Sequence, residues 1–115
     1  MKVSFDGIDS QVMTFHNSPA ALAVPGDPVA MTAGGTVGLA AADAVFCGIC
    51  VGGDENYSAV QVRGVITVPY TGTAPAVGYA KLASGGTGKV AAKTAGREYL
   101  VLVVDTTAKT VTFVL

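Results

Sequence analysis

A Gly-Gly-Thr turn sequence occurs twice in this chain of 115 residues, as Gly34-Gly35-Thr36 and Gly85-Gly86-Thr87. Each copy is followed by a stretch rich in Val and Ala and then by an apolar run, residues 46–51 in the first copy and 99–104 in the second. Glycine-rich turns between short apolar strands are typical of small β folds. The repetition predicts two related β-units, and chance recurrence of a common turn sequence is the alternative explanation.

The clearest strand pattern covers residues 59–70. One parity holds Val60, Val62, Ile66, Val68 and Tyr70, and the other holds Gln61, Arg63 and Thr67. A two-residue period predicts a strand with one buried and one polar face. Gly64 falls on the apolar parity and predicts a bulge or bend, as expected where a sheet curls into a barrel.

Further strand signals lie at both ends of the chain. Residues 99–104 and 110–115 predict a hairpin with its turn at 105–109, and residues 2–5 and 11–15 predict a smaller one. We therefore predict an all-β fold, a small β-barrel or sandwich built from short strands. An N-terminal hairpin or arm (1–25) would precede a β-barrel-like domain (26–115), and together they would form one globular domain.

Composition limits the classes of partner. Only 13% of residues are charged and the net charge is −1, whereas soluble domains average about 25% charged residues. Such a weakly charged surface suggests that a partner covers part of it. The cations form no basic stripe, and no apolar run approaches the ~20 residues of a membrane span, so we expect no nucleic-acid or membrane partner.

Cys47-Gly48-Ile49-Cys50 has the C-x-x-C spacing of redox dithiols and zinc sites. A redox pair normally lies at a helix N-terminus, which lowers the thiol pKa. Here both cysteines fall in a predicted strand, where residues three apart point to opposite faces. A structural zinc needs four ligands, and His16 is the only histidine. The pattern favours two reduced, buried cysteines.

Other motifs are equally weak as catalytic signals. Residues 83–90 resemble a phosphate-binding loop, but Ala83 and Val90 replace its Gly and its Ser or Thr, which favours a β-turn with Lys89 exposed. The sequence contains no G-x-S-x-G motif that would supply a nucleophile for His16 to activate, so we interpret His16 as a polar residue at the end of a strand. The adjacent Asp54 and Glu55 read as a solvated loop tip. We therefore predict no enzyme activity, no catalytic residue, no cofactor and no metal.

Several segments, in order, resemble a family of small tailed-phage capsid decoration (cement) proteins. The similar pieces are Gly26-Asp27-Pro28-Val29, Gly35–Ala40 with Ala42-Asp43-Ala44, Val60–Val65 with Val68-Pro69, and Val77-Gly78-Tyr79-Ala80. After the Val-Pro strand the family usually has Gly-Asp-x-Val-Tyr, whereas this chain has Ala76-Val77-Gly78-Tyr79, without the Asp. The resemblance covers residues 26–115.

The resemblance implies a structural virion protein that binds the outer surface of a bacteriophage capsid and stabilises contacts between capsomers. Its partners would be the major capsid protein and its own copies, as a trimer or dimer. It would be made in the host cytoplasm and end on the capsid exterior. One alternative is a non-catalytic β binding module for a host surface, a glycan or another virion protein. A carrier domain modified at Lys109 is another.

Overall fold

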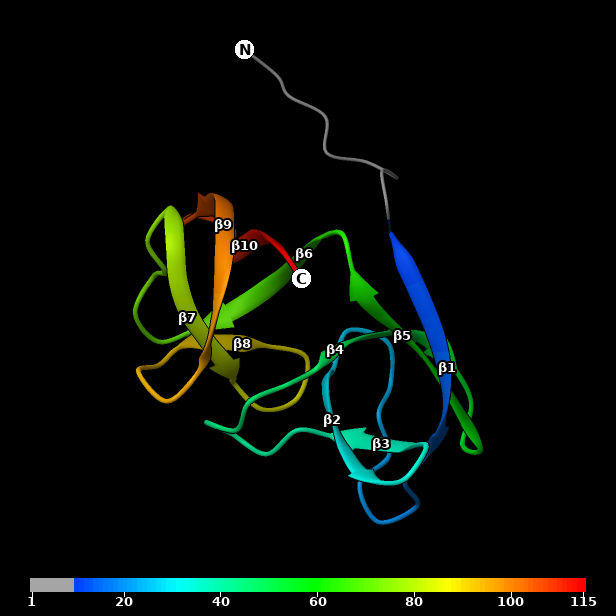
Figure 1. Cartoon of the computed structure of the whole chain (residues 1–115). Coiled ribbons are helices and arrows are strands. Elements are labelled where there is room, and N and C mark those ends of the chain that lie inside the picture. Colours follow the sequence, from blue (N-terminus) through cyan, green and yellow to red (C-terminus); the bar gives the residue numbers. More distant parts are fainter. Residues whose placement is uncertain (1–9) are drawn as a thin grey trace.

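The computed structural model describes residues 10–115 and consists of two five-stranded β-barrels (Figure 1). Unit 1 (residues 10–63) contains β1 (Gln11–Asn17), β2 (Pro28–Ala33), β3 (Thr36–Leu39), β4 (Gly48–Gly53) and β5 (Tyr57–Arg63). Unit 2 (residues 65–115) contains β6 (Val65–Thr71), β7 (Gly78–Ser84), β8 (Val90–Ala92), β9 (Arg97–Asp105) and β10 (Thr110–Val114). The all-β prediction and its barrel form are confirmed.

The two units share one topology. Unit 1 has the closed order β1-β3-β2-β4-β5, and unit 2 has the same order when β6–β10 are matched to β1–β5. In both units the first strand pairs in parallel with the third, through His16 with Thr36 and Tyr70 with Val90. The two Gly-rich segments form the equivalent connections β2–β3 and β7–β8. The prediction of two related β-units is therefore confirmed at the level of architecture.

Gly64 separates the two units. The predicted strand over residues 59–70 is two strands, because β5 ends at Arg63 and β6 begins at Val65. Gly64 has φ +101°, and a Cβ there would lie 2.9 Å from Ser10 Cα. Only glycine combines this left-handed conformation with so close a backbone approach.

The prediction that Gln61 lies on an exposed polar face is wrong, because its side chain is buried. It lies beside the junction, and its side-chain amide donates to the carbonyl oxygens of Arg63 and Val65 at 3.3 and 3.1 Å. These hydrogen bonds explain how a polar side chain can be buried at this position.

The main core belongs to unit 2 but is completed by unit 1. The β3–β4 connection leaves unit 1 and passes beneath unit 2 (Figure 1). Its Phe46 is fully buried, stacks on Tyr99 with ring centroids 5.2 Å apart, and meets Phe113 edge-on at 6.3 Å. The Tyr99 hydroxyl donates to the Phe46 carbonyl oxygen at 3.0 Å. The two barrels thus share one aromatic core.

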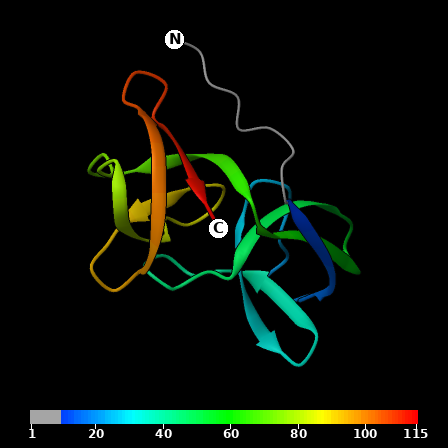
Figure 2. The same ribbon diagram turned by 45° about the horizontal axis from the view of Figure 1, so that its top comes forward.

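Backbone hydrogen bonds fix the same connection along unit 2. The Ser84 hydroxyl donates to the Ala40 carbonyl oxygen at 2.9 Å, and the Ser84 N–H donates to that of Ala44 at 2.8 Å. The Asp43 N–H donates back to Ser84 O at 2.8 Å. The arrangement is seen from a second direction in Figure 2, where the connection runs below β8 and β9. These contacts hold the units in one relative position.

Unit 1 has a smaller core of its own, made of Ala23, Val29, Val37, Cys50 and Val60. A tight turn precedes β2: Asp27 N–H donates to Val24 O at 3.0 Å, with Gly26 at φ +97°. The Asp27 carboxylate accepts the Val24 N–H at 2.9 Å, which closes the turn from both sides. This agrees with the interpretation of Gly26-Asp27-Pro28-Val29 as a turn leading into a strand.

The terminal hairpins have different outcomes. The C-terminal one is confirmed, since β9 and β10 pair around residues 106–109 and bury Val111 and Phe113. Residues 2–5 of the N-terminal one lie outside the described part. Residues 11–15 form most of β1, which pairs with β5 and with β3. The boundary expected at residue 25 therefore falls inside a barrel.

Candidate interaction surface

The two cysteines lie in unlike surroundings. Cys47 precedes β4 and is half-buried, whereas Cys50 lies inside β4 and is buried; both are free thiols. Cys50 Sγ accepts the Ser58 hydroxyl at 3.2 Å and faces Gly52 O at 3.3 Å. Burial raises the pKa of the Cys47 thiol above its ordinary value. Because the thiolate is the reactive form, this geometry makes neither cysteine a ready nucleophile.

Alkylation should therefore be slow in the folded chain. A raised pKa leaves less thiolate at neutral pH, by about tenfold per pKa unit, and burial also blocks access. We expect iodoacetamide to label the native protein at least about tenfold more slowly than the urea-unfolded protein at the same pH. Mass spectrometry measures both rates. Equal rates would contradict the structure, and a Cys50→Ser variant identifies the labelled site.

The other candidate chemical residues are dispersed. His16 is exposed on β1 and packs against the Tyr57 ring, with centroids 5.4 Å apart. Asp54 caps the β4–β5 connection: its carboxylate accepts the N–H groups of Asn56 and Tyr57 at 2.8 and 2.9 Å, which lowers its pKa. Glu55 is exposed beside it. Asp54 and Glu55 form a solvated loop tip, as predicted.

The remaining two motifs lie in connections of unit 2. Residues 85–89 join β7 to β8, and a short strand follows where a phosphate-binding loop would need a helix. Lys109 is the last residue of the β9–β10 turn, with φ +57°. Across residues 10–115, no three His, Cys, Asp or Glu side chains lie close enough to hold a metal ion. The described residues also contain no helix long and apolar enough to cross a membrane.

Exposed apolar side chains concentrate on unit 1. Of the eleven large apolar side chains that are exposed between residues 10 and 115, eight belong to it: Val12, Met13, Leu22, Val24, Met31, Val45, Val51 and Tyr57. Unit 2 contributes Val77, Tyr79 and Val103. Single exposed apolar residues are ordinary, but a cluster of them marks an interaction surface.

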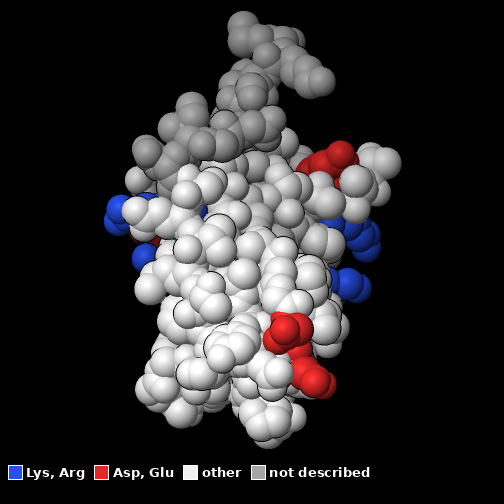
Figure 3. Space-filling view, turned by 90° about the vertical axis from the view of Figure 1, so that its right-hand side faces the viewer, with Lys and Arg blue, Asp and Glu red and all other residues white. Residues whose placement is uncertain are grey.

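Two of these side chains, Val12 and Tyr57, lie on one face of the sheet that β1 forms with β5. Strand register places His16 opposite Tyr57 and Thr14 opposite Ala59. The alternate positions Asn17, Ser58 and Val60 are buried in unit 1. We call Val12, Thr14, His16, Tyr57 and Ala59 the sheet face. Figure 3 views the side where β1 and β5 lie: its middle is largely uncharged, acidic groups lie low on it and at the upper right, and basic atoms lie only at the margins. Such a surface can be desolvated at low cost.

The edge of β1 adjoins this sheet face. On one side β1 pairs with β5 from Gln11 to His16, but on the other side its pairing with β3 involves only His16 and Asn17. Within the described part of the chain, residues 11–15 thus have no strand partner on that side. An open strand edge offers backbone donors and acceptors to another chain.

Charge divides between the units, a feature that the lack of a basic stripe in the sequence does not reveal. Unit 1 holds Arg63 against Asp27, Asp43, Asp54 and Glu55, a side-chain charge of −3. Unit 2 holds Lys81, Lys89, Lys93, Arg97 and Lys109 against Glu98 and Asp105, a side-chain charge of +3. Counting charges on either side of Gly64 would have revealed this polarity.

Comparison with protein-family models, curated proteins and solved structures gives no significant match to this chain. The features of the molecule that bear on its function are the sheet face, the open edge of β1 and the difference in charge between the units.

Proposed function

We propose that this protein is a structural virion protein that decorates the outer surface of a phage capsid and stabilises contacts between capsomers. The sheet face carries the proposal, because it is largely exposed and holds no formally charged side chain, on a chain that has few charges overall. Its partner would be the major capsid protein. The resemblance in sequence supports the same role.

The fold suits a role as a passive reinforcement. Two barrels with a common core present a rigid surface, so little conformational entropy is lost when that surface is covered. The open edge of β1 could add backbone hydrogen bonds to a strand of the shell at the margin of the sheet face. On an icosahedral lattice, many copies bound side by side would add avidity to a weak single contact.

Binding to a capsid tests the proposal directly. Purified protein should co-sediment with expanded capsids of the phage that encodes it and should raise their melting temperature. Thr14→Asp places a charge at the centre of the sheet face and should weaken binding at least about tenfold, because an unpaired buried charge costs a few kcal/mol. Thr71→Asp, an exposed strand position of unit 2, is the matched control.

The outcomes separate the two candidate functions. If capsids neither bind the protein nor gain stability at micromolar concentration, the decoration role is wrong. A binding module for a glycan would instead give a signal on a glycan array, with Tyr57 and His16 as the exposed rings available for stacking on a sugar. Equal loss of binding in Thr14→Asp and Thr71→Asp would place the contact elsewhere.

A further inference from the structure

We propose that copies of this chain associate head to tail, with a projection on unit 2 of one copy seated in a groove on unit 1 of the next. The contact uses none of the residues of the sheet face and needs no capsid. It rests on three observations, namely a shaped apolar groove in the negative unit, exposed apolar side chains in the positive unit, and the opposite charges that flank them.

The groove lies at the end of unit 1. It has a volume of about 260 Å³ and is lined by Asn17, Leu22, Ala23, Val24, Pro25, Gly53, Asp54 and Glu55. Leu22 and Val24 supply an apolar wall, and the only charged residues in the lining are the two carboxylates. The buried Asn17 side chain braces it, donating to the carbonyl oxygens of Ala23 and Asp54 at 3.0 Å each. The groove is thus preformed.

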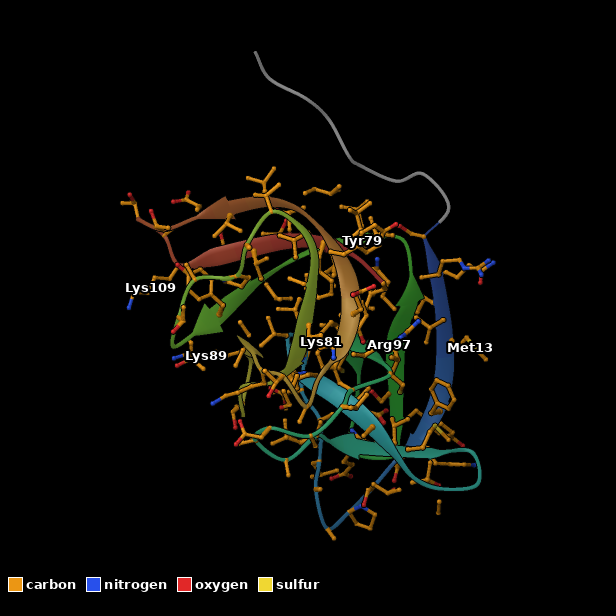
Figure 4. All side chains as sticks on the ribbon, turned by 60° about the vertical axis from the view of Figure 1, so that its left-hand side comes forward. Met13, Tyr79, Lys81, Lys89, Arg97 and Lys109 are labelled. Carbon is orange, nitrogen blue, oxygen red and sulfur yellow. The ribbon has the colours of Figure 1, made fainter. Side chains whose placement is uncertain are left out.

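The projection consists of Val77, Tyr79 and Lys81, which lie just before and at the start of β7. Val77 and Tyr79 are 69% and 73% exposed, the two highest values among the exposed large apolar side chains. Lys81 follows on the same face of β7, and a shallow hollow beside it is lined by Lys81, Lys93 and small apolar residues. Figure 4 shows Tyr79 and Lys81 on β7, with Met13 of β1 on a different side. Glu98, opposite Lys81, is the one carboxylate where β7 and β9 pair, between Arg97 and Val101 on β9.

Charge identifies the occupant of the groove as a second copy. The groove combines apolar walls with Asp54 and Glu55, so it fits an apolar side chain that has a cation next to it. Tyr79 with Lys81 on the same chain has this combination. The one ion pair among the described residues, Lys93 Nζ to Asp43 Oδ1 at 3.5 Å, already joins the positive unit to the negative one within a copy.

The geometry makes the contact heterologous. In Figure 1, β7 lies at the outer left of unit 2, while the β4–β5 connection that borders the groove lies at the far right of unit 1. A projection therefore cannot reach the groove of its own copy. The end copies of an open assembly keep one free groove and one free projection, so the association continues into a chain unless it closes as a ring.

Two variants test the pairing. The projection variant Tyr79→Ser/Lys81→Glu keeps its groove, and the groove variant Leu22→Ser/Glu55→Lys keeps its projection. Tyr79 and Leu22 are 73% and 45% exposed, and Lys81 and Glu55 are exposed as well. Both variants should therefore fold. Sedimentation velocity should show wild-type oligomers that weaken as salt rises. Each variant alone should be monomeric, and an equimolar mixture should form a 1:1 complex.

The control is Val103→Ser/Lys89→Glu, which removes an exposed apolar side chain and reverses a cation elsewhere on unit 2. It should associate like the wild type. A wild-type protein that stays monomeric at millimolar concentration and low salt would overturn the proposal, whether or not capsids bind it. Oligomers that persist in both variants, or a mixture that stays monomeric, would overturn it as well. Circular dichroism verifies that each variant is folded.

Discussion

Replacing Phe46 by alanine is expected to lower the free energy of unfolding by about 3–5 kcal/mol, the usual cost of removing a fully buried phenylalanine. Phe46 is 0% exposed and contacts the rings of Tyr99 and Phe113. The loss would be a large part of the stability of a domain this size, which is typically 5–15 kcal/mol. Urea denaturation followed by circular dichroism measures it.

The neighbouring residue provides the control. Val45 is 49% exposed, so Val45→Ala should change the free energy of unfolding by no more than about 0.5 kcal/mol. Because Phe46 comes from unit 1 and fills unit 2, we also expect one unfolding transition for the wild type, with both units unfolding together. A Phe46→Ala variant as stable as Val45→Ala would mean that the connection does not anchor the two barrels.

Gly48→Ala is expected to destabilise the protein by about 1–3 kcal/mol or more, as overpacking of a close contact does. A Cβ at Gly48 would lie 2.5 Å from the Gln61 carbonyl oxygen and 2.6 Å from Val60 Cγ1. The oxygen belongs to the backbone of β5 and cannot rotate away, so β4 and β5 would have to separate. The measurement is the shift of the urea midpoint at unchanged slope.

Gly34→Ala is the matched comparison, since a Cβ there meets no atom within 4 Å and Gly34 is exposed in the β2–β3 turn. It should leave stability within about 0.5 kcal/mol of the wild type. Equal effects of the two substitutions would show that backbone flexibility, and not the approach of β5, decides the role of Gly48. Gly48 lies between Cys47 and Cys50. A larger loss of stability for Gly48→Ala than for Gly34→Ala would show that strand packing requires the glycine in the C-x-x-C sequence.

Local patterns predicted much of the fold because they record local constraints. The alternation across residues 59–70 correctly separates buried from exposed positions at Val60, Val68 and Tyr70. It cannot show that the strand changes barrels at Gly64, because a bend leaves the two-residue period unchanged. Gln61 was misplaced for a related reason: its partners, the carbonyls of Arg63 and Val65, are created by that bend.

The candidate surfaces were less predictable. Low charge indicated that some surface is covered, yet the sheet face depends on β1 pairing with β5, residues far apart in the chain. The groove likewise joins residues 17–25 to residues 53–55. A single sequence does not report such contacts, since any apolar strand could satisfy the same pattern.

Patterns among neighbouring residues were enough to predict the all-β class, the glycine turns and two related β-units, because turn conformation and strand alternation are local properties. Only the folded structure shows that Phe46 of one unit completes the core of the other and that β1 closes the first barrel. It also gathered the exposed apolar side chains into a face and a groove. These features arise from packing between distant segments, where shape and burial choose among partners that local chemistry leaves equivalent.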